Sequence, residues 1–445
     1  MSHVVIIGNG IAGITAARHI RKFSDKQITV ISAETDYFFS RTALMYVYMG
    51  HLKFEHTQPY ENRFWKKNRI DLKQAYIEEV DFKNKKLFSA VGEEIAYDQL
   101  ILATGSVTNF RGWKGQEIDG VQGLVSKQDL ELLEKNSTNL THAVIVGGGL
   151  IGVELAEMLH TRKIEVSMLV REPHFWGSVL PKEEGKLISK HIQQHGINLL
   201  FETELDEIIA DANNQVKAII TKSGQQIECQ LVGVATGVKP NISFLKNTEL
   251  ETDKGILVNR NLETNISDVY AIGDCAQQRE AIGNRKPVEA VWYTGRMMGE
   301  AVAQSICGNP TAYHPGNWFN SAKFFDIEYQ TYGWVFPERK KKENEAHFHW
   351  RYPKEKRCIT LAFDKDSETV LGINTFGIRL RHEVFDKWLS EKRTIDYVME
   401  HLRDANFDPE FYKNFESQIV SKYNSDFGKS IHPKKKNLKR IFQLN

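Results

Sequence analysis

Cysteine is scarce in this 445-residue chain, which has only Cys229, Cys275, Cys307 and Cys358. No two of them form a Cys-x-x-Cys pair, and residues 1–228 contain none. The pattern excludes a Cys-x-x-Cys metal or redox motif and argues against a disulfide scaffold. We therefore expect four buried structural thiols and no metal centre.

Long hydrophobic runs and a charge imbalance are also missing. No apolar run approaches the roughly 20 residues of a membrane-spanning helix. The first predicted strand starts at His3, which leaves no room for a signal peptide. The formal net charge of +1 disfavours nucleic-acid binding. The sequence thus predicts a cytoplasmic protein of about two to four domains.

What the sequence does contain is a glycine-rich turn near its start. An apolar strand, His3–Ile7, precedes Gly8-Asn9-Gly10-Ile11-Ala12-Gly13, and residues 14–23 have helical composition. A second strand, Gln27–Ser32, and then Glu34 complete a strand–turn–helix–strand unit that is typical of dinucleotide binding.

Each residue type in this unit has a physical role. Gly8 permits the tight turn, Gly10 lets the backbone approach a pyrophosphate, and Gly13 lets helix and strand pack closely. The start of the helix offers unpaired N–H groups and a partial positive charge to phosphates. Glu34 is placed to accept hydrogen bonds from ribose hydroxyls.

The segment after Glu34 adds one candidate and two strands. Arg41, among aromatic residues, could reach a pyrophosphate or cover an adenine, and a surface arginine is the alternative. Asp71–Ile77 is predicted to be a strand. Tyr97–Ser106 is predicted to be a buried strand that ends in the turn Ala103-Thr104-Gly105.

Residues 142–170 repeat the first pattern. The strand Ala143–Val146 leads into Gly147-Gly148-Gly149-Leu150-Ile151-Gly152, and a helix, Val153–Thr161, and a strand, Glu165–Val170, come next. Two such units imply two nucleotide ligands. An enzyme that holds two dinucleotides most simply passes a hydride between them.

The residues after this second unit bear on the choice of coenzyme. An acid at the last strand position would favour NAD by binding the 2′-hydroxyl, but the strand ends in Val170. Arg171 could bind a 2′-phosphate, whereas Glu172 could serve the ribose hydroxyls. A solvated Arg–Glu pair is the alternative, so NADPH has only a slight preference over NADH.

Further signals occur in the next hundred residues. Thr236-Gly237 repeats the Thr-Gly turn and, with the repeated glycine motif, marks an internal duplication. Thr264–Asp274 predicts a strand that delivers Asp274 into a turn before a helix, beside a ligand crevice. The predicted helix Ala290–Cys307 carries Trp292 near its start.

The character of the chain changes after Thr311. Alternating apolar and polar runs, dense in aromatic residues, predict an antiparallel sheet at residues 347–352, 358–363 and 369–376. Helices are predicted at His382–Ser390, Thr394–His401 and Asp408–Lys422. Basic residues cluster at 339–342 and 434–440, where a solvated surface is the ordinary interpretation and an anionic partner the alternative.

The motifs GNGIAG, ATGS, GGGLIG, ATGVKP and VYAIGD, in this order and spacing, closely resemble those of the FAD-dependent pyridine-nucleotide-disulfide oxidoreductase superfamily. The resemblance covers residues 3–310 and implies FAD on the first unit and NAD(P)H on the second. The expected fold is α/β, with two nested Rossmann-like domains and a C-terminal α+β domain. The expected domain bounds are 1–117 with 242–311 for FAD, 118–241 for NAD(P)H, and 312–445 for a C-terminal interface domain that would form a homodimer.

The resemblance also implies roles for single residues. Asp274 would hold the ribityl chain of FAD, and the backbone of Ile77 would contact the adenine. The expected cofactor-binding residues are Gly8, Gly10, Ile11, Ala12, Gly13, Glu34, Arg41, Ile77, Ala103, Thr104, Gly105, Asp274, Trp292, Gly147, Gly149, Leu150, Ile151, Gly152, Arg171, Glu172 and Gly237.

The branch within the superfamily depends on the residues shortly after Glu34. Disulfide reductases carry a cysteine pair there, and related peroxidases and oxidases carry one cysteine, but residues 41–46 read RTALMY. The chain is therefore similar to ferredoxin and rubredoxin reductases, whose Arg-Pro-x-Leu stretch matches Arg41 and Leu44. That branch often pairs a lysine, here replaced by Tyr46, with a glutamate that matches Glu154. Tyr46 and Glu154 are the catalytic candidates.

These features lead to one hypothesis and two alternatives. The hypothesis is a FAD-dependent NAD(P)H oxidoreductase that passes electrons through the flavin to a ferredoxin- or rubredoxin-type protein. The first alternative is an NAD(P)H:quinone reductase that docks on a membrane through a weakly amphipathic tail containing Ile431, Leu438, Ile441 and Phe442. The second is a flavin-bound redox sensor or interaction protein.

Overall fold

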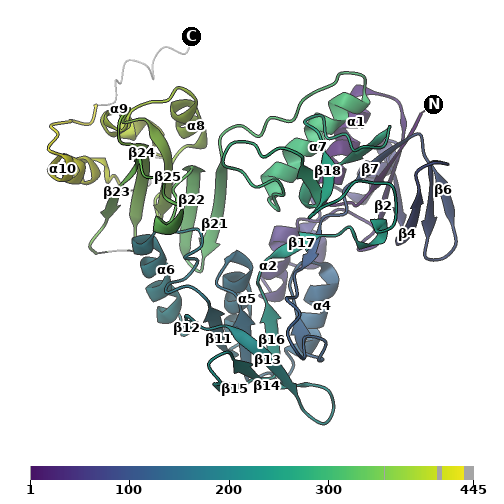
Figure 1. Ribbon diagram of the computed structural model, residues 1–445, viewed down its shortest axis with the longest axis horizontal. Coiled ribbons are helices and arrows are strands. Elements are labelled where there is room, and N and C mark those ends of the chain that lie inside the picture. Colours follow the sequence, from purple (N-terminus) through teal and green to yellow (C-terminus); the bar gives the residue numbers. More distant parts are fainter. Residues whose placement is uncertain (1, 355, 408–412, 435–445) are drawn as a thin grey trace. The chain divides into compact units, whose positions relative to one another are not determined.

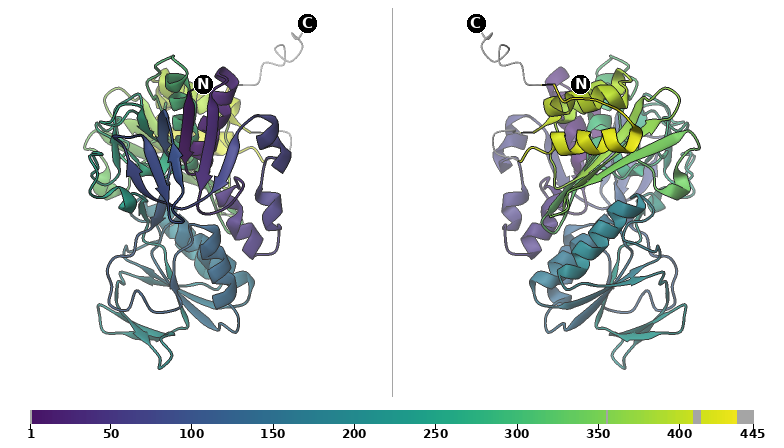
Figure 2. Two further views of the ribbon diagram at one scale, coloured as in Figure 1. Left: turned by 90° about the vertical axis from the view of Figure 1, so that its right-hand side faces the viewer. Right: turned by 90° about the vertical axis from the view of Figure 1, so that its left-hand side faces the viewer.

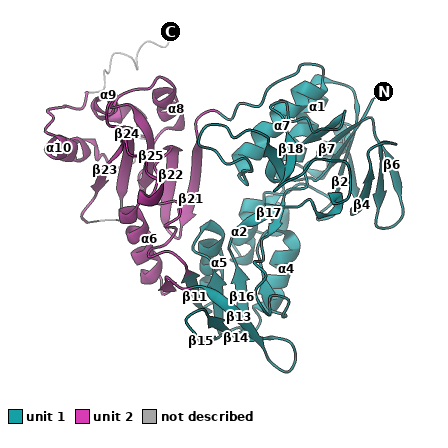
Figure 3. Ribbon diagram, viewed as in Figure 1, with its two compact units in different colours: residues 1–169, 204–315 teal, residues 170–203, 316–445 magenta. Residues whose placement is uncertain are grey.

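The structure is a computed structural model that describes residues 2–354, 356–407 and 413–434 (Figures 1 and 2). The chain forms two compact units (Figure 3). Unit 1 comprises residues 1–169 and 204–315, and unit 2 comprises residues 170–203 and 316–445. Parallel sheets with helices occur in unit 1, and an antiparallel sheet with helices occurs in unit 2. The expected α/β class is therefore confirmed.

The first parallel sheet of unit 1 has the strand order β19-β7-β1-β2-β3. The central strand β1 (His3–Ile7) pairs with β2 (Gln27–Ser32) and with β7 (Gln99–Leu102). The outer strands are β3 (Asp71–Gln74) and β19 (Val269–Ala271). Apolar side chains of β1 are buried because both faces of a parallel sheet are covered.

Two helices pack against each other beside this sheet, although 268 residues separate the end of the first from the start of the second. They are α1 (Ile11–Phe23) and α7 (Trp292–Ile306), seen side by side in Figure 1. A Cβ atom at Gly299 of α7 would lie 2.6 Å from the carbonyl oxygen of Ala12. The close approach of the two backbones therefore requires glycine at this position.

The second parallel sheet contains the strands of the second glycine motif. In unit 1 its order is β11-β10-β16-β9. The strands are β9 (Val121–Gln122), β10 (His142–Val146), β11 (Glu165–Val170) and β16 (Leu231–Val234). The helix α5 (Leu150–Thr161) packs against β10 and β16, and α4 (Lys127–Asn136) begins with a capping box formed by Ser126 and Asp129.

The internal duplication includes a side-chain hydrogen bond between the first two strands of each copy. Nε2 of His3, at the start of β1, lies 2.9 Å from the Thr29 hydroxyl on β2. Nε2 of His142, at the start of β10, lies 3.0 Å from the Ser167 hydroxyl on β11. The same hydrogen bond therefore ties the first two strands together in both copies.

Smaller elements complete unit 1. Two antiparallel sheets consist of β4 (Ile77–Asp81), β5 (Lys86–Ser89) and β6 (Glu94–Ala96), and of β13 (Leu205–Ala210), β14 (Val216–Thr221) and β15 (Gln226–Glu228). Two-stranded pairs are formed by β8 (Ser106–Thr108) with β17 (Val238–Pro240), and by β18 (Ile256–Val258) with β20 (Ala276–Gln278). The remaining helices are α2 (Leu44–Tyr48) and α3 (Asn62–Lys67).

Several element bounds differ from the sequence-based expectation. The strand predicted at Asp71–Ile77 is two strands, because the chain leaves β3 after Gln74 and Ile77 opens β4 in another sheet. The turn that holds Asp274 leads into the strand β20 and not directly into a helix. The two helices after the glycine motifs start three residues earlier than expected, at Ile11 and Leu150. The first turn of a helix can lie within the motif because its N–H groups need no partner inside the helix.

Unit 2 contains an antiparallel sheet of order β21-β22-β25-β24-β23. Its strands are β21 (Phe319–Phe324), β22 (Ile327–Gly333), β23 (Glu345–Arg351), β24 (Cys358–Asp364) and β25 (Val370–Phe376). The other elements are α6 (Lys182–Gln194), β12 (Asn198–Phe201), α8 (His382–Ser390), α9 (Ile395–His401) and α10 (Glu416–Phe427). The predicted helix Asp408–Lys422 therefore starts later, and residues 408–412 lie outside the described part of the chain.

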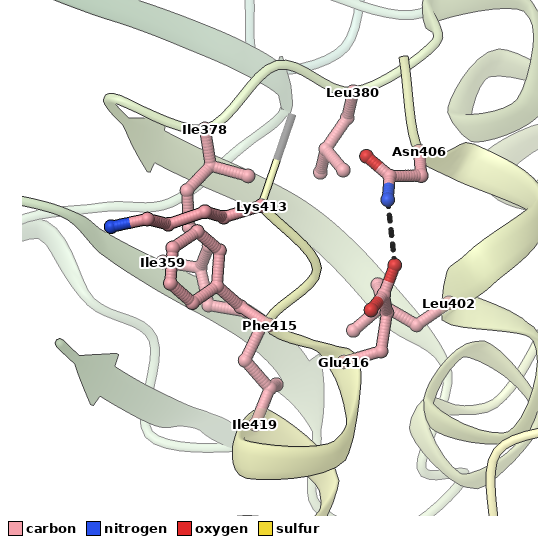
Figure 4. A pocket seen from close by; sticks show the side chains of 9 residues that line it. All are labelled: Ile359, Ile378, Leu380, Leu402, Asn406, Lys413, Phe415, Glu416 and Ile419. Atoms are coloured by element: carbon pink, nitrogen blue, oxygen red, sulfur yellow. Dashed lines mark hydrogen bonds between the residues drawn. The ribbon is translucent and has the colours of Figure 1, made fainter. Parts of the chain in front are cut away.

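A pocket lies in unit 2 between strands of the sheet and the segment that leads into α10 (Figure 4). Its lining residues are Ile359, Ile378, Leu380, Leu402, Asn406, Lys413, Phe415, Glu416 and Ile419. The Asn406 amide donates a hydrogen bond of 2.7 Å to Glu416 Oε1. None of the expected cofactor-binding residues is among the residues that line this pocket.

Candidate nucleotide-binding site

The first glycine of each motif packs closely against a backbone carbonyl oxygen of a neighbouring segment. Gly8 has φ +115° and donates its N–H to Ile31 O at 2.8 Å, and a Cβ here would lie 2.1 Å from Ala103 O. Gly147 has φ +123°, and a Cβ there would lie 2.4 Å from Ala235 O. Any side chain at either position would collide with the neighbouring strand end, so both turns require glycine.

The other glycines of the first motif have different surroundings. A Cβ at Gly13 would lie 2.1 Å from Gly8 O, so helix and turn are in close contact. A Cβ at Gly10 would meet no atom within 4 Å. The turn is therefore tightly packed at Gly13, whereas the space beside Gly10 is open. The N–H groups of Ile11 and Ala12, in the first turn of the helix, follow Gly10 directly.

The second motif repeats this arrangement. Gly149 caps α5, and the N–H groups of Leu150 and Ile151 lie in its first turn, which contains no acidic residue. A Cβ at Gly152 would lie 2.4 Å from Gly147 O. Both helix N-termini thus combine free N–H donors with a positive dipole end and no competing carboxylate, which suits a pyrophosphate.

Glu34 lies just beyond β2 and forms a bidentate ion pair with Arg41. The guanidinium nitrogens of Arg41 lie 2.8 Å from Oε1 and 2.6 Å from Oε2 of Glu34. The N–H of Lys127, at the start of α4, donates to the same Oε1 at 2.8 Å. These bonds orient the carboxylate, and Oε2 keeps capacity to accept a bond from a ribose hydroxyl.

Asp274 lies in the 3-10 turn Gly273–Cys275, which follows β19. The hydroxyl of Ser106, the last residue of the ATGS motif, donates a hydrogen bond of 2.8 Å to Asp274 Oδ2. Burial raises the pKa of Asp274, while the Ser106 hydrogen bond and the positive charge of Arg41 oppose that rise. Ser106 was missed as a site residue, although its place in the motif was visible in the sequence.

The turn at Asp274 and the start of α7 both lie against the start of α1. A Cβ at Gly273 would be 3.0 Å from Ala12 Cβ, and a Cβ at Gly295 would be 3.5 Å from the Ile11 side chain. Trp292, which opens α7, is half-buried against Tyr293 with ring centroids 5.3 Å apart. The structure therefore gathers the first glycine motif, Asp274 and the start of α7 in one region.

The threonines of the two ATG turns hold the crossing segments of unit 1 together. The Thr104 hydroxyl donates to Asn241 O at 2.7 Å, and the Thr236 hydroxyl donates to Asn109 O at 2.9 Å. These bonds flank the antiparallel pair of β8 and β17. Each threonine thus secures the segment that leaves the opposite copy of the duplicated fold, a role that sequence reasoning missed.

The glycines next to these threonines have a second part in the same arrangement. Gly105 has φ +68° and Gly237 has φ +96°, and a Cβ on either would meet no atom within 4 Å. Asn241 N–H donates to Gly105 O, and Asn109 N–H donates to Gly237 O, both at 3.0 Å. The positive φ explains the glycines, and the open space beside them leaves room for a ligand.

Ile77 and Ala103 are buried in the core around the first sheet. Ile77 opens β4, and Ala103 N–H donates to Ile7 O at 2.8 Å directly after β7. Neither side chain faces open space, so any part in ligand binding falls to their backbone groups.

Glu154 lies on α5, two residues after the second glycine motif, and is half-buried. Burial raises the pKa of Glu154 to about 7, and the nearby Glu157 carboxylate adds to the shift. Among the described residues, Tyr46 forms no hydrogen bond with Glu154 and instead stacks on His51 at 6.1 Å. The structure therefore supports Glu154 as a proton-holding group near neutral pH but not the Tyr46–Glu154 pair.

Arg171 and Glu172 follow β11 and lie in unit 2. Arg171 lies 3.2 Å from Oε1 of Glu172, and Arg339, from a distant segment of the same unit, lies 3.8 Å from that oxygen. The Glu172 side chain is 14% exposed, whereas those of Arg171 and Arg339 are 67% and 52% exposed. One shielded carboxylate oxygen thus pairs with two accessible guanidinium groups, the second of which the sequence did not reveal.

The cysteines have no redox partner in this structure. All four are free; Cys229, Cys275 and Cys358 are buried, but Cys307 is only partly buried, so the expectation of four buried thiols is wrong for Cys307. Burial raises the pKa of Cys275, whose thiol contacts Leu102 O and Ile272 O at 3.4 and 3.3 Å.

Comparison with known proteins agrees with this geometry. The family model of pyridine nucleotide-disulphide oxidoreductases matches residues 2–299. This chain belongs to that family. The superfamily resemblance seen in the sequence is therefore confirmed, and the chain is an NAD(P)H-dependent flavoprotein oxidoreductase with FAD as its cofactor.

Two curated relatives and one solved structure illustrate the similarity. The chain is 28% identical over 312 residues to the rubredoxin-NAD(+) reductase of Pseudomonas putida, which covers 69% of this chain and 80% of that protein. It is 29% identical over 317 residues to the NAD(P)H nitrite reductase of Bacillus subtilis, or 71% of this chain but only 38% of that protein. The structure of a ferredoxin reductase from Rhodopseudomonas palustris superposes with a TM-score of 0.78 at 22% identity, over 95% of this chain and 100% of that one.

The family's cofactors fit the residues that are present. The space in front of Gly10, the uncapped start of α1 and the oriented Glu34 carboxylate match a pyrophosphate and a ribose. Within the described residues, every helix is too short or too polar to span a bilayer. The tail residues Leu438, Ile441 and Phe442, on which the membrane-docking alternative rests, lie outside the described part of the chain.

Proposed function

We propose that the electrons leave this enzyme for a small iron–sulfur protein of the rubredoxin or ferredoxin class. The observation that carries the proposal is the absence of a thiol in residues 41–46, the segment formed by the 3-10 turn Arg41–Ala43 and α2. Disulfide-reducing members of the superfamily keep their cysteines at this place. Cys275, which adjoins Asp274, is fully buried with a raised thiol pKa, so it is no substitute.

The chain's own residues would bind and orient the two nucleotides. The N–H groups at the starts of α1 and α5 would bind the two pyrophosphates, and Glu34, held by Arg41, would accept a ribose hydroxyl. Asp274, held by Ser106, would bind the ribityl chain. When bound, FAD accepts a hydride from NAD(P)H and returns the electrons one at a time. The similarity to a rubredoxin reductase over 80% of its length supports a one-electron acceptor protein.

The same proposal includes NADPH as the preferred coenzyme. The accessible guanidinium groups of Arg171 and Arg339, which both lie within 4 Å of Glu172 Oε1, are suited to bind a 2′-phosphate. That phosphate carries up to two negative charges, so it competes well against the single Glu172 carboxylate for these arginines. NADH lacks the phosphate and would gain nothing from either arginine.

Anaerobic titration tests the first half of the proposal. The holoprotein is mixed with NADPH and, separately, with NADH, while the visible flavin absorption is followed. We expect fast bleaching by NADPH and slower bleaching by NADH. A protein that carries flavin but is bleached by neither coenzyme would contradict the reductase assignment.

Acceptor specificity tests the second half. The NADPH-reduced enzyme is mixed with a rubredoxin, a [2Fe–2S] ferredoxin, a short-chain quinone and a disulfide substrate. We expect at least one of the two iron–sulfur proteins to be reduced at a rate that keeps pace with flavin reduction. Fast reduction of the disulfide or the quinone alone would overturn the proposed acceptor class.

The same proposal includes the location and the oligomeric state of the protein. We propose a cytoplasmic protein that forms a homodimer through residues 312–445, where aromatic residues are dense. Sedimentation of the holoprotein over a range of concentrations tests the dimer, and fractionation of the source cells tests the location. A monomer at all concentrations would contradict the proposed homodimer.

A further inference from the structure

Unit 2 contains a cluster of metal-ligating side chains that lie far from one another in the sequence. His191 lies in the last turn of α6, and His195 directly follows the end of that helix. Because they are four residues apart, both side chains lie on the same face. Asp326 lies in the tight turn between β21 and β22. The sequence analysis expected no metal centre, because it considered only the cysteine pattern and did not weigh the His191–His195 spacing.

The three side chains present their ligand atoms to one point. His191 Nε2 lies 2.7 Å and His195 Nε2 lies 3.2 Å from the same carboxylate oxygen of Asp326. All three ligand atoms lie within 4.8 Å of one another. The His191 and His195 rings are nearly perpendicular, with centroids 4.6 Å apart.

The surroundings hold these side chains in place. The His195 ring stacks on Phe325 with centroids 4.3 Å apart and an angle of 9° between the ring planes. His191 is fully buried, His195 is partly buried, and the Asp326 side chain is 72% exposed. The cluster is therefore fixed on the protein side and accessible to solvent on the side of Asp326.

We propose that His191, His195 and Asp326 form a binding site for a divalent transition metal, with zinc as the ion that fits best. Two imidazoles and one carboxylate are a common ligand set for zinc, with bonds of about 2.0–2.2 Å. Tetrahedral bonds of that length place neighbouring ligand atoms about 3.3 Å apart. The observed separations from Asp326 differ from this by less than about 1 Å, and the solvent side leaves a fourth position for water.

Lys356 bears directly on the affinity of this site. Its Nζ lies 2.6 Å from His191 Nδ1, so the ammonium donates to Nδ1 and the ring proton is on Nε2, pointing at Asp326. A metal ion on Nε2 needs the other tautomer, in which Nδ1 carries the proton. Lys356 therefore has to leave Nδ1 when a metal binds, and its positive charge opposes the ion as well.

The bound ion would join α6 to the β21–β22 turn. α6 follows the segment that carries Arg171 and Glu172, whereas the turn belongs to the C-terminal sheet. Both lie in unit 2. Metal binding would therefore stabilise unit 2 without a part in the redox reaction.

The test is a metal titration of the holoprotein after dialysis against a chelator. Zn²⁺ affinity is measured by competition with a coloured chelator, and Co²⁺ absorption reports coordination by the same residues. We expect one equivalent per chain, a higher melting temperature with Zn²⁺, and an affinity that falls on the order of 100-fold in His195→Gln and about 10-fold in Asp326→Asn. The control His160→Gln, which removes an exposed histidine of α5, should bind as the wild type does.

Lys356→Met provides a test in the opposite direction, and we expect it to raise the Zn²⁺ affinity at least about tenfold. Misfolding would lower the Zn²⁺ affinity of every variant. A higher Zn²⁺ affinity in Lys356→Met therefore cannot result from misfolding. The proposal is overturned if the wild type binds no Zn²⁺ after dialysis, if His195→Gln binds as tightly as His160→Gln, or if Lys356→Met weakens binding.

Discussion

Gly10 and Gly13 differ in what an added methyl group would meet, and this difference predicts different outcomes for two single substitutions. A Cβ at Gly13 would lie 2.1 Å from Gly8 O and 3.2 Å from the Ile6 side chain. A Cβ at Gly10 would meet nothing within 4 Å, and φ at Gly10 is −67°, which alanine adopts freely. Gly13→Ala must push α1 away from β1, whereas Gly10→Ala fills only the space that we assign to the pyrophosphate.

The size of each effect follows from these surroundings. Gly10→Ala should change the free energy of unfolding of the apoprotein by less than about 1 kcal/mol, because restriction of the unfolded chain offsets the weaker helix cap. Gly13→Ala should cost roughly 1–3 kcal/mol or more, the range for overpacked sites. If Gly10→Ala removes one or two charge-assisted hydrogen bonds of about 1.5–3 kcal/mol each, FAD affinity falls at least about tenfold.

The assay measures the two quantities separately. Thermal unfolding of the flavin-free protein gives stability, and quenching of FAD fluorescence gives the dissociation constant. We expect Gly10→Ala to melt within about 3 °C of the wild type and to bind FAD weakly. Gly13→Ala should melt lower even without FAD. Wild-type FAD affinity in Gly10→Ala, or equal destabilisation of the two apoproteins, would refute the reasoning.

Three further predictions concern other parts of the chain. Glu184 on α6 is fully buried, and its Oε2 accepts a 2.8 Å hydrogen bond from Asn374; burial raises its pKa to about 7, although hydrogen bonds from Thr360 and Asn374 oppose the rise. The folded state therefore keeps a proton that the unfolded chain has already released, so this group's contribution to stability falls as the pH rises from about 4.5 to 7. Glu184→Gln should lose that fall, and urea midpoints at pH 5 and pH 8 that differ as much as in the wild type would contradict it. Arg339→Gln should raise the KM for NADPH about tenfold and leave that for NADH unchanged, because only the phosphate uses the arginine; equal effects in steady-state assays with both coenzymes would exclude the 2′-phosphate role. Thr104→Val should cost about 1 kcal/mol in chemical denaturation by removing the bond to Asn241 O, while FAD affinity stays within about threefold; a large loss of FAD affinity at unchanged stability would show that the hydroxyl serves the ligand instead.

Two carboxyls with raised pKa values, Glu154 and Glu184, allow the effects of pH on coenzyme chemistry and on stability to be tested separately. Glu154 and Glu184 both have a pKa near 7 because burial disfavours their charged forms. Glu154 stands at the second glycine motif, whereas Glu184 lies in unit 2 and contacts the C-terminal sheet through Asn374. A pH profile of activity that changes in Glu154→Gln but not in Glu184→Gln would assign the catalytic effect to Glu154 alone.

The local parts of this protein were determined by the sequence. Strand, turn, helix and following acid occur within about 35 residues, and the steric needs of a tight turn and a close helix restrict each glycine position. His3–Ile7 and Gln27–Ser32 were therefore predicted with their true bounds. The antiparallel runs after Thr311 were likewise visible, because period-two alternation reports a half-buried strand directly.

The long-range parts were decided by the tertiary structure alone. The bond from Thr104 to Asn241, the approach of Arg339 to Glu172, and the meeting of His191 with Asp326 each join residues more than 130 positions apart. No local pattern encodes such a meeting, because it depends on how sheets and helices pack after the chain has folded. The sequence by itself predicted two dinucleotide-binding turns, because each motif is local, whereas only the packing of distant segments brought together the side chains that we propose to orient the ligands and to bind a metal.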